Sequence, residues 1–341
     1  MRSTSSRALV LLALLAGCAI AQRIVRPASP LTGYWDARLA YDNNVFRCSE
    51  TDLAEFRTGL EPLRYPMRSA DDLGLVFGAG WRYRLRPAGR TLGLSLRGRL
   101  HQYVSNTEKS YGFIEAEVDR RVSGRVTLKG SALWLPSYLI RYYRDPRNRP
   151  GPNVACRFSE LLLSAGAEVR AGRARFEPRY RLQYDDYLVP FDYYDTKAHR
   201  FGAGLHWQAL RSLELRAGYD RRLAFAQGPD PDISYRGHDF EFRALLRPAR
   251  TGLDFGCGYD LGLRDYTAAQ GLAHAGRKDA KHELGLEAGY RLGAVRFRLR
   301  YEAEWRNVGS PDPSVEDLKA YRQMRLVLGV RMDPQEIGGE R

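Results

Sequence analysis

A strict alternation of apolar and charged residues recurs in this chain from about residue 34 to residue 332. This pattern constrains the fold more than any other feature. In residues 295–306, Val, Phe, Leu, Tyr, Ala and Trp occupy one parity, and Arg or Glu occupies the other. Successive side chains on a β-strand point to opposite faces, so this segment has one apolar face and one ionic face. Because so large an ionic face cannot form a packed core, we expect a sheet that separates hydrocarbon from water.

We therefore predict an all-β protein, a closed antiparallel up-and-down transmembrane β-barrel of about 14 strands. A soluble β-propeller also repeats short strands, but the chain shows no repeated blade signature. Residues 22–341 contain no shift in composition and no Pro-rich linker, so we expect a single outer-membrane β-barrel domain there. The predicted strands are 33–45, 72–86, 91–105, 110–122, 125–143, 159–170, 174–188, 197–209, 213–226, 234–248, 251–266, 280–292, 294–307 and 320–332.

The connections between these strands alternate in length. Tight turns rich in Gly and small polar residues alternate with longer, irregular stretches. Barrels of bacterial outer membranes have short periplasmic turns and longer external loops, so we expect both termini in the periplasm. Within the long connections, residues 49–56 and 313–318 are expected to hold short helices.

Residues 1–21 have the layout of a signal peptide. Two arginines precede an apolar run over residues 8–16, which is too short to span a bilayer. Two processing sites compete: cleavage after Ala21, and a bacterial lipobox that would leave Cys18 lipidated. Both take the chain out of the cytoplasm, and the expected location is the bacterial outer membrane.

Composition argues against two other classes of protein. The mean hydropathy of -0.47 and the absence of a long apolar run after the leader exclude a helical membrane protein. The net charge of +14 would suit nucleic-acid binding. However, the arginines are spread at strand spacing and interleaved with acids, so we expect no nucleic-acid partner.

The inward parity of the predicted strands collects the charged side chains, because an Arg or Lys that faces lipid at mid-membrane costs about 2–4 kcal/mol. Most of these residues are expected to form cross-strand salt bridges that stiffen the wall. The surplus of arginine is expected to attract anions, and any obstruction of the lumen is expected from loops that fold inward. The residues predicted to line the pore are Arg82, Arg84, Arg97, Arg99, Arg179, Arg181, Arg216, Arg243, Arg296, Arg298, Arg300, Glu115, Glu117 and Glu302.

The leading functional hypothesis is a passive pore for small polar or anionic solutes, and not an enzyme. The sequence contains no nucleotide-binding, zinc-protease or Cys-x-x-Cys motif, so no metal and no cofactor are expected. The expected partners are outer-membrane lipid and the small polar or anionic solutes themselves.

A lipid-modifying hydrolase embedded in the barrel is one alternative. Its chemistry needs a nucleophile, a base and an orienting group at the outer wall, where lipid can reach them. His199 and His238 have outward parity near the external rim, and Ser234 is nearby. No Ser–His pair with a supporting acid is evident, so we predict no catalytic residues.

Three cysteines follow the leader. Cys48 and Cys156 fall in predicted external loops of an oxidising compartment, where a disulfide between them and two free thiols are both open alternatives. Cys257 has apolar parity and is expected to face lipid.

The segment from Tyr41 to Arg47 reads Tyr-Asp-Asn-Asn-Val-Phe-Arg. It resembles the Tyr-Asp-x-Asn-Val-Phe-Arg opening of a family of porin-like bacterial outer-membrane β-barrels, some of them associated with exopolysaccharide export. The resemblance implies an outer-membrane barrel and supplies a second alternative, a structural barrel that serves the export of a surface polysaccharide. It also implies the barrel-assembly machinery as a partner. That machinery commonly reads an aromatic residue at the end of the last strand, whereas the predicted strand here ends at Met332.

Overall fold

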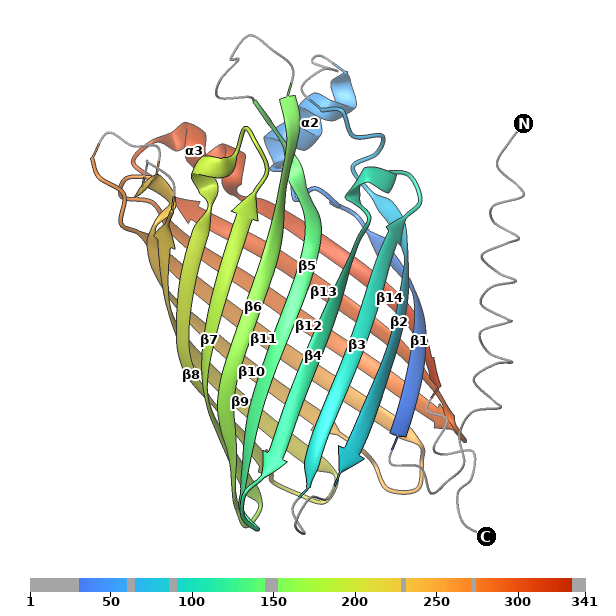
Figure 1. The fold of residues 1–341 in the computed structure, drawn as a ribbon. Helices are drawn as coiled ribbons and strands as arrows, with labels where there is room; N and C mark the ends of the chain where they lie inside the picture. Colours follow the sequence, from blue (N-terminus) through green and yellow to red (C-terminus); the bar gives the residue numbers. More distant parts are fainter. Residues whose placement is uncertain are drawn as a thin grey trace.

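The computed structural model describes residues 31–59, 65–85, 91–144, 153–227, 231–270 and 274–332. These residues form one closed barrel of antiparallel strands, in which each strand pairs with its neighbour in sequence and the last pairs with the first (Figure 1). The predicted fold class and the predicted number of strands are confirmed. The strands are β1 (Leu31–Asp42), β2 (Asp72–Leu85), β3 (Leu92–Tyr103), β4 (Tyr111–Arg121), β5 (Val126–Arg144), β6 (Asn153–Ala171), β7 (Ala174–Tyr187), β8 (Thr196–Gln208), β9 (Leu213–Ala226), β10 (Tyr235–Leu246), β11 (Leu253–Tyr266), β12 (Lys278–Leu292), β13 (Val295–Gly309) and β14 (Tyr321–Met332).

The outer surface of the barrel is apolar, as the alternation predicts. Leu96, Leu286 and Leu328 are each about half exposed, although they lie in the middle of paired strands. Exposed aromatic rings, among them Trp81 and Tyr290, lie toward the end where the short turns are. An apolar band bordered by aromatic side chains is the surface that a barrel presents to lipid.

The connections reproduce the predicted alternation. At one end of the barrel, turns such as Gly172-Arg173 and Gly293-Ala294 join strands directly. At the other end lie the longer loops with the helices α2 (Glu50–Thr58) and α3 (Pro313–Lys319) (Figure 1). Within the described residues, no helix is both long and apolar enough to cross a membrane. An even-stranded barrel with this surface and this asymmetry is the architecture of bacterial outer membranes, which confirms the expected location.

Both predicted loop helices are present, and local sequence explains where they begin and end. The Ser49 hydroxyl oxygen accepts a hydrogen bond from the Asp52 N–H at 3.1 Å, and the Asp52 carboxylate accepts one from the Ser49 N–H at 3.5 Å. This capping box starts α2, and Gly59 ends it in the left-handed conformation with φ of 66°. Pro313 opens α3, where a missing N–H does no harm.

Two strand boundaries differ from the prediction by three residues or more. The first strand ends at Asp42 instead of residue 45, because residues 43–45 leave the sheet. The sixth strand begins at Asn153 instead of residue 159, so Cys156 lies on β6 and not in a loop. The sixth strand is thus longer than predicted, and its added residues pair with the external end of β5.

Because the outer face meets hydrocarbon, we expect Leu286→Arg to lower the free energy of unfolding in lipid vesicles by about 2–4 kcal/mol. Leu292→Arg is the matched control, since it lies on the same face of β12 at the end near the short turn, where the cost is about 0–1 kcal/mol. Urea titration of both variants measures the difference. Equal costs at the two positions would contradict the assignment of the outer face to lipid.

Candidate functional site: a segmented lumen

The chain turns into the barrel directly after β1. The Asn44 side-chain amide donates hydrogen bonds to the backbone carbonyls of Cys48 and Arg322, both at 2.8 Å. Its side-chain oxygen accepts the Cys48 N–H at 2.8 Å. The Asp42 carboxylate accepts the Asn44 N–H at 3.0 Å and the Gln323 amide at 2.7 Å. These bonds fold residues 43–48, here called the infolded segment, away from the wall.

Arg47 ties the infolded segment to the wall at β13 and β14. Its guanidinium donates to Glu304 at 3.1 Å and to Gln323 at 3.2 Å, and it lies 5.9 Å from the centroid of the Tyr321 ring. The backbone of Arg47 has φ of 53°, a left-handed conformation that costs about 1–2 kcal/mol in a residue with a Cβ. The three side-chain contacts hold the residue in this conformation.

Phe46 connects the infolded segment to β5. Its ring is buried and packs 5.8 Å from that of Tyr142 on β5, a strand that is separated from β1 by three others. The infolded segment therefore extends from the end of β1 to the external end of β5. Phe46 belongs to a buried apolar cluster that joins the infolded segment, α2 and β5; its other buried members are Val45, Cys48, Leu53, Met67 and Leu139.

Lys109 lies in the loop between β3 and β4, and its ammonium packs against the Phe46 ring of this apolar cluster. We call the cluster and Lys109 together the roof. Lys109 lies in the short 3₁₀ helix η2 (Thr107–Lys109), and its ammonium donates to the carbonyls of Leu139 and Ile140. The pairing of β5 with β6 is irregular at this point, and a β-bulge leaves carbonyls without a ladder partner. Burial lowers the pKa of Lys109, whereas its cation–π contact with Tyr138 favours the charged form.

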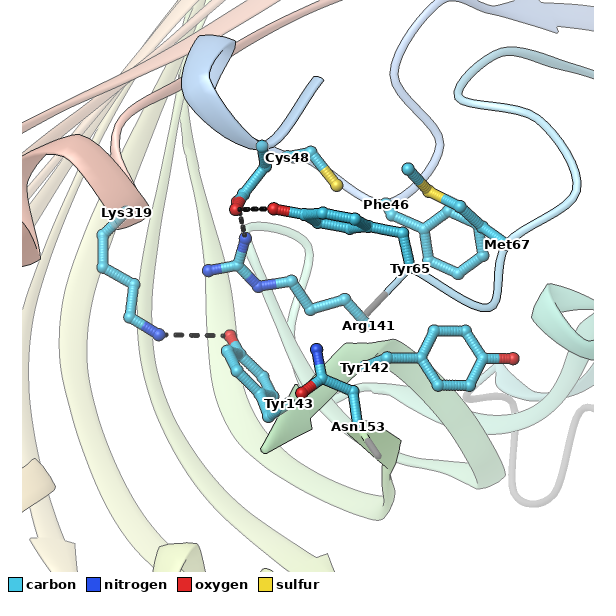
Figure 2. Close-up of a pocket in the computed structure, with 10 residues that line it drawn as sticks. Phe46, Cys48, Tyr65, Met67, Arg141, Tyr142, Tyr143, Asn153 and Lys319 are labelled. Atoms are coloured by element: carbon cyan, nitrogen blue, oxygen red, sulfur yellow. Dashed lines mark hydrogen bonds and ion pairs between the residues drawn. The ribbon is translucent and has the colours of Figure 1, made fainter. Parts of the chain in front are cut away.

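A cavity of about 350 Å³ opens at the external mouth, between the infolded segment, α2 and α3 (Figure 2). The Tyr65 hydroxyl donates to Asp52 at 2.8 Å, and Arg141 donates to the same carboxylate at 3.4 Å. The Lys319 ammonium donates to the Tyr143 hydroxyl at 3.3 Å. Arg141 and Lys319 also lie within 5 Å of the Tyr143 ring centroid. Two cations and the phenol between them therefore form the floor of the mouth.

Beneath this floor lies a second cavity of about 370 Å³, here called the upper chamber. Its lining is rich in cations and tyrosines. The nine basic residues are Arg47, Lys109, Arg141, Arg222, Arg264, Arg277, Lys281, Arg306 and Lys319, the seven tyrosines are Tyr138, Tyr143, Tyr187, Tyr194, Tyr235, Tyr266 and Tyr321, and the two acids are Asp185 and Asp279.

A third cavity of about 410 Å³, here called the lower chamber, has a different charge. Its five arginines face seven carboxylates; the arginines are Arg47, Arg216, Arg243, Arg300 and Arg325, and the carboxylates are Glu214, Glu241, Asp260, Glu283, Glu287, Glu302 and Glu304.

The three cavities adjoin one another. Phe46, Arg141, Tyr143 and Lys319 line both the mouth and the upper chamber. Arg47 lines both the upper and the lower chamber. The lumen is thus a series of compartments, with cationic side chains at each boundary.

Ion pairs of unequal exposure cover the wall. In the pairs Arg97–Glu115, Lys129–Glu168 and Arg216–Glu214, the basic side chain is 46%, 43% and 41% exposed, and the acid is 11%, 5% and 14% exposed. Short carboxylates lie against the wall, and long basic side chains extend from it. At these pairs the wall therefore presents mainly the positive group to the lumen water, whereas in Arg222–Asp239 and Lys281–Glu283 the acid is the more exposed partner.

Glycines make this arrangement possible. A Cβ at Gly202 would lie 2.0 Å from a carboxylate oxygen of Asp220, and a Cβ at Gly289 would lie 2.1 Å from one of Asp254. Asp220 can therefore lie flat across β8 while it accepts hydrogen bonds from Arg179 at 2.7 Å and Arg181 at 2.6 Å. The glycines that alternate along the inward faces are positions where a neighbouring charged side chain needs the space.

All fourteen residues predicted to line the pore have the inward parity of their strands. Arg216, Arg243, Arg300 and Glu302 line the lower chamber. Arg179 and Arg181 share Asp220 in a side cavity of about 320 Å³. The others lie on the wall outside these cavities: Arg82 pairs with Asp119, Arg97 with Glu115 and Glu117, Arg99 with Asp36, Arg296 with Asp254 and Arg298 with Glu287, while Arg84 is exposed near the end of β2.

None of the predicted residues lines the upper chamber. Its strand residues Arg222, Arg264 and Arg306 have inward parity at the external ends of their strands, a signal present in the sequence. Lys109 and Lys319 come from loops, where the period of two gives no information. Their position becomes evident only when the loops are packed together.

The structure contains no disulfide between Cys48 and Cys156; both are buried free thiols. Of the two alternatives left open, the structure has the free thiols. The placement of Cys156 in a loop is wrong, since it lies on β6, while Cys48 is held beside Asn44 in the infolded segment. Burial raises the pKa of Cys48 to about 11. Cys257 is exposed on the outer face, as predicted.

The residues considered for a hydrolase are not arranged as a catalytic group. Nδ1 of His199 bonds to the Tyr180 hydroxyl at 2.7 Å, and Nδ1 of His238 bonds to that of Tyr219 at 2.8 Å. The Ser234 hydroxyl oxygen accepts the Ala226 N–H at 2.9 Å. Each of these groups has a structural partner, and Ser234 bonds to backbone instead of to a histidine.

No family model and no curated protein matches this sequence. Among solved structures, the barrel is similar to the outer membrane channel DcaP of Acinetobacter baumannii, with 10% identity, a TM-score of 0.48 and coverage of 89% of this chain and 96% of that chain. It is also similar to an anion-selective porin from Comamonas acidovorans, with 10% identity, a TM-score of 0.45 and coverage of 89% and 98%. OprD of Pseudomonas aeruginosa has 11% identity, a TM-score of 0.40 and coverage of 92% and 98%. These likenesses concern the barrel fold.

We expect the Cys48 thiol to resist alkylation in the native barrel at pH 8, because a thiol with a pKa of about 11 is almost wholly protonated there. Raising the pH toward that pKa should speed the reaction, because the thiolate is the nucleophile. Peptide mapping after iodoacetamide treatment checks this. After unfolding without reductant, Cys48 and Cys156 should both be labelled, and failure to label either would indicate a disulfide.

We expect Arg47→Gln to widen the boundary between the two chambers, because the bond to Glu304 and the cation over Tyr321 are lost. The single-channel conductance in a planar bilayer should rise. Arg57→Gln is the matched control, since Arg57 is exposed at the end of α2 in the same loop. An unchanged conductance in the Arg47 variant would contradict the role of this residue as a boundary.

Proposed function

We propose that this protein is a passive outer-membrane pore and that small anionic solutes pass through its lumen in preference to cations. The observation that carries the proposal is the upper chamber, where nine basic side chains face two acidic ones. A low-dielectric wall lined by one sign of charge raises the local concentration of counter-ions. Anions therefore accumulate on the external side of Arg47.

The lower chamber allows release. Its carboxylates outnumber its arginines, so an anion that leaves the upper chamber meets a lining that holds it weakly. Conduction requires sites that are favourable enough to enter and weak enough to leave. The change in lining charge from one chamber to the next meets both requirements.

A non-enzymatic role fits this arrangement better than hydrolysis, because the rim histidines and Ser234 have structural partners. The Tyr41–Arg47 motif suggested polysaccharide export, but its residues have structural roles in the infolded segment. Asn44 forms the turn, Phe46 belongs to the buried apolar cluster, and Arg47 forms the boundary between the chambers. No further observation favours either alternative.

The test is the reversal potential of the reconstituted protein in a planar bilayer under a KCl gradient. The wild-type pore should prefer chloride. The double variant Arg264→Gln/Lys319→Gln removes two cations of the upper chamber and should reduce the chloride-to-potassium permeability ratio by at least about fivefold, given ~0.5–1 kcal/mol for each unit charge at a few ångströms in water.

The matched control is Arg236→Gln/Lys278→Gln, which removes the same charge at the same end but from exposed positions on the outer face. Its permeability ratio should equal that of the wild type. Cation preference in the wild type, or equal shifts in the two double variants, would overturn the proposal.

A further inference from the structure

Three tyrosine–histidine pairs recur on the outer face of the barrel, and the pore does not use them. Tyr180 pairs with His199 at 2.7 Å, Tyr219 with His238 at 2.8 Å, and Tyr259 with His282 at 2.7 Å, each time from a phenol oxygen to Nδ1. The pairs bridge β7 to β8, β9 to β10 and β11 to β12. One arrangement is therefore repeated on three consecutive pairs of strands.

The strand register places these pairs at one height. The row of paired residues through His199 meets β10 at Arg236, two residues from His238. The row through His238 meets β12 at Ala280, two residues from His282. Strands in a barrel are tilted, so positions of equal height shift steadily from strand to strand, and this constant offset defines a level belt.

Cations lie directly above this belt on the same face. Lys197 and Arg236 each precede the belt histidine of their strand by two residues, on the side of the external loops. Arg322 on β14 is opposite Trp305, whose ring stacks on that of His282 at a centroid distance of 4.9 Å. Lys278 is higher on β12, and Arg221 contacts His238 within the belt.

The charge on this sector is one-sided. Among the described outward residues of the external halves of β7 to β14, the five cations accompany two acids, Asp186 at the end of β7 and Asp265, which is opposite Arg236 and Lys278. Arg236, Lys278 and Arg322 are exposed. Lys and Arg near a membrane boundary extend to the headgroups, and each contributes attraction to anionic lipid.

We propose that the outer face of β7–β14 is a binding site for the phosphorylated headgroup of an outer-leaflet glycolipid. The aromatic and imidazole rings lie at the boundary of the hydrocarbon, and the cations two residues above them pair with the phosphates. With Nδ1 bonded to a tyrosine, Nε2 of His199 and His282 is the ring atom that faces a headgroup oxygen. The site lies outside the lumen and does not depend on solute transport.

The experiment measures binding of bisphosphorylated lipid A to the purified full-length barrel in neutral detergent micelles, by native mass spectrometry across a lipid titration. Lipid A from which both phosphates have been removed is the ligand control, because it has the same acyl chains. We expect binding of the phosphorylated form to be at least about tenfold stronger and to weaken with added salt.

The variant Lys197→Gln/Arg236→Gln/Arg322→Gln should lose at least about tenfold in affinity for bisphosphorylated lipid A. The matched control is Arg120→Gln/Arg125→Gln/Arg211→Gln, which removes the same charge from exposed positions at the opposite end of the barrel and should bind as the wild type does. Heat-modifiable gel migration verifies that both variants are folded. Equal binding of the two lipid forms, or equal losses in the two variants, would overturn the proposal.

Discussion

Every strand of this barrel must place alternate residues in hydrocarbon, and this constraint shapes the rest of the molecule. At mid-membrane the charged residues can only face the lumen, because an Arg or Lys that faces lipid there costs about 2–4 kcal/mol. Acids and bases are therefore forced to share one enclosed surface. The structure resolves the crowding by size: Asp220 lies against the glycine of a neighbouring strand, whereas Arg179 and Arg181 reach over it into the lumen. Pairing and a positive interior are thus compatible.

The infolded segment shows how a short sequence builds the boundary between two compartments. The Asn44 side chain bonds to the N–H and the carbonyl of Cys48 and to the carbonyl of Arg322 on β14. These bonds reverse the direction of the chain. Phe46 is then buried in the roof, and Arg47 extends to Glu304. Asparagine suits this position because its amide is at once donor and acceptor, while phenylalanine supplies apolar area and arginine supplies reach. The segment is held by directional bonds at its base and by packing at its tip.

The sequence was sufficient to predict the barrel, the number of strands, the loop helices and the inward residues, because each rests on a local rule. A period of two assigns Arg300 to the lumen, and a capping box at Ser49 starts α2 without reference to the rest of the chain. The upper chamber obeys no such rule. It forms where Lys109, Arg141 and Lys319 arrive from three separate places in the sequence, and their positions are determined by packing against Phe46 and Tyr143. The position of Cys156 could not be predicted for a similar reason, because it depends on where β6 begins.

The distribution of charge also explains why the net charge of +14 does not produce a uniformly basic protein. At the external end the excess is divided by the barrel wall, with the upper chamber inside and the cations above the tyrosine–histidine belt outside. A wall of one strand thickness separates the two groups, yet each faces a different medium. The outer cations are next to headgroups, which neutralise them, so they add little to the field in the lumen. The inner cations outnumber the acids of the upper chamber, with nine basic side chains and two acidic ones in its lining. Anion preference should therefore depend on the inner group alone, even though both groups are at the same end of the molecule.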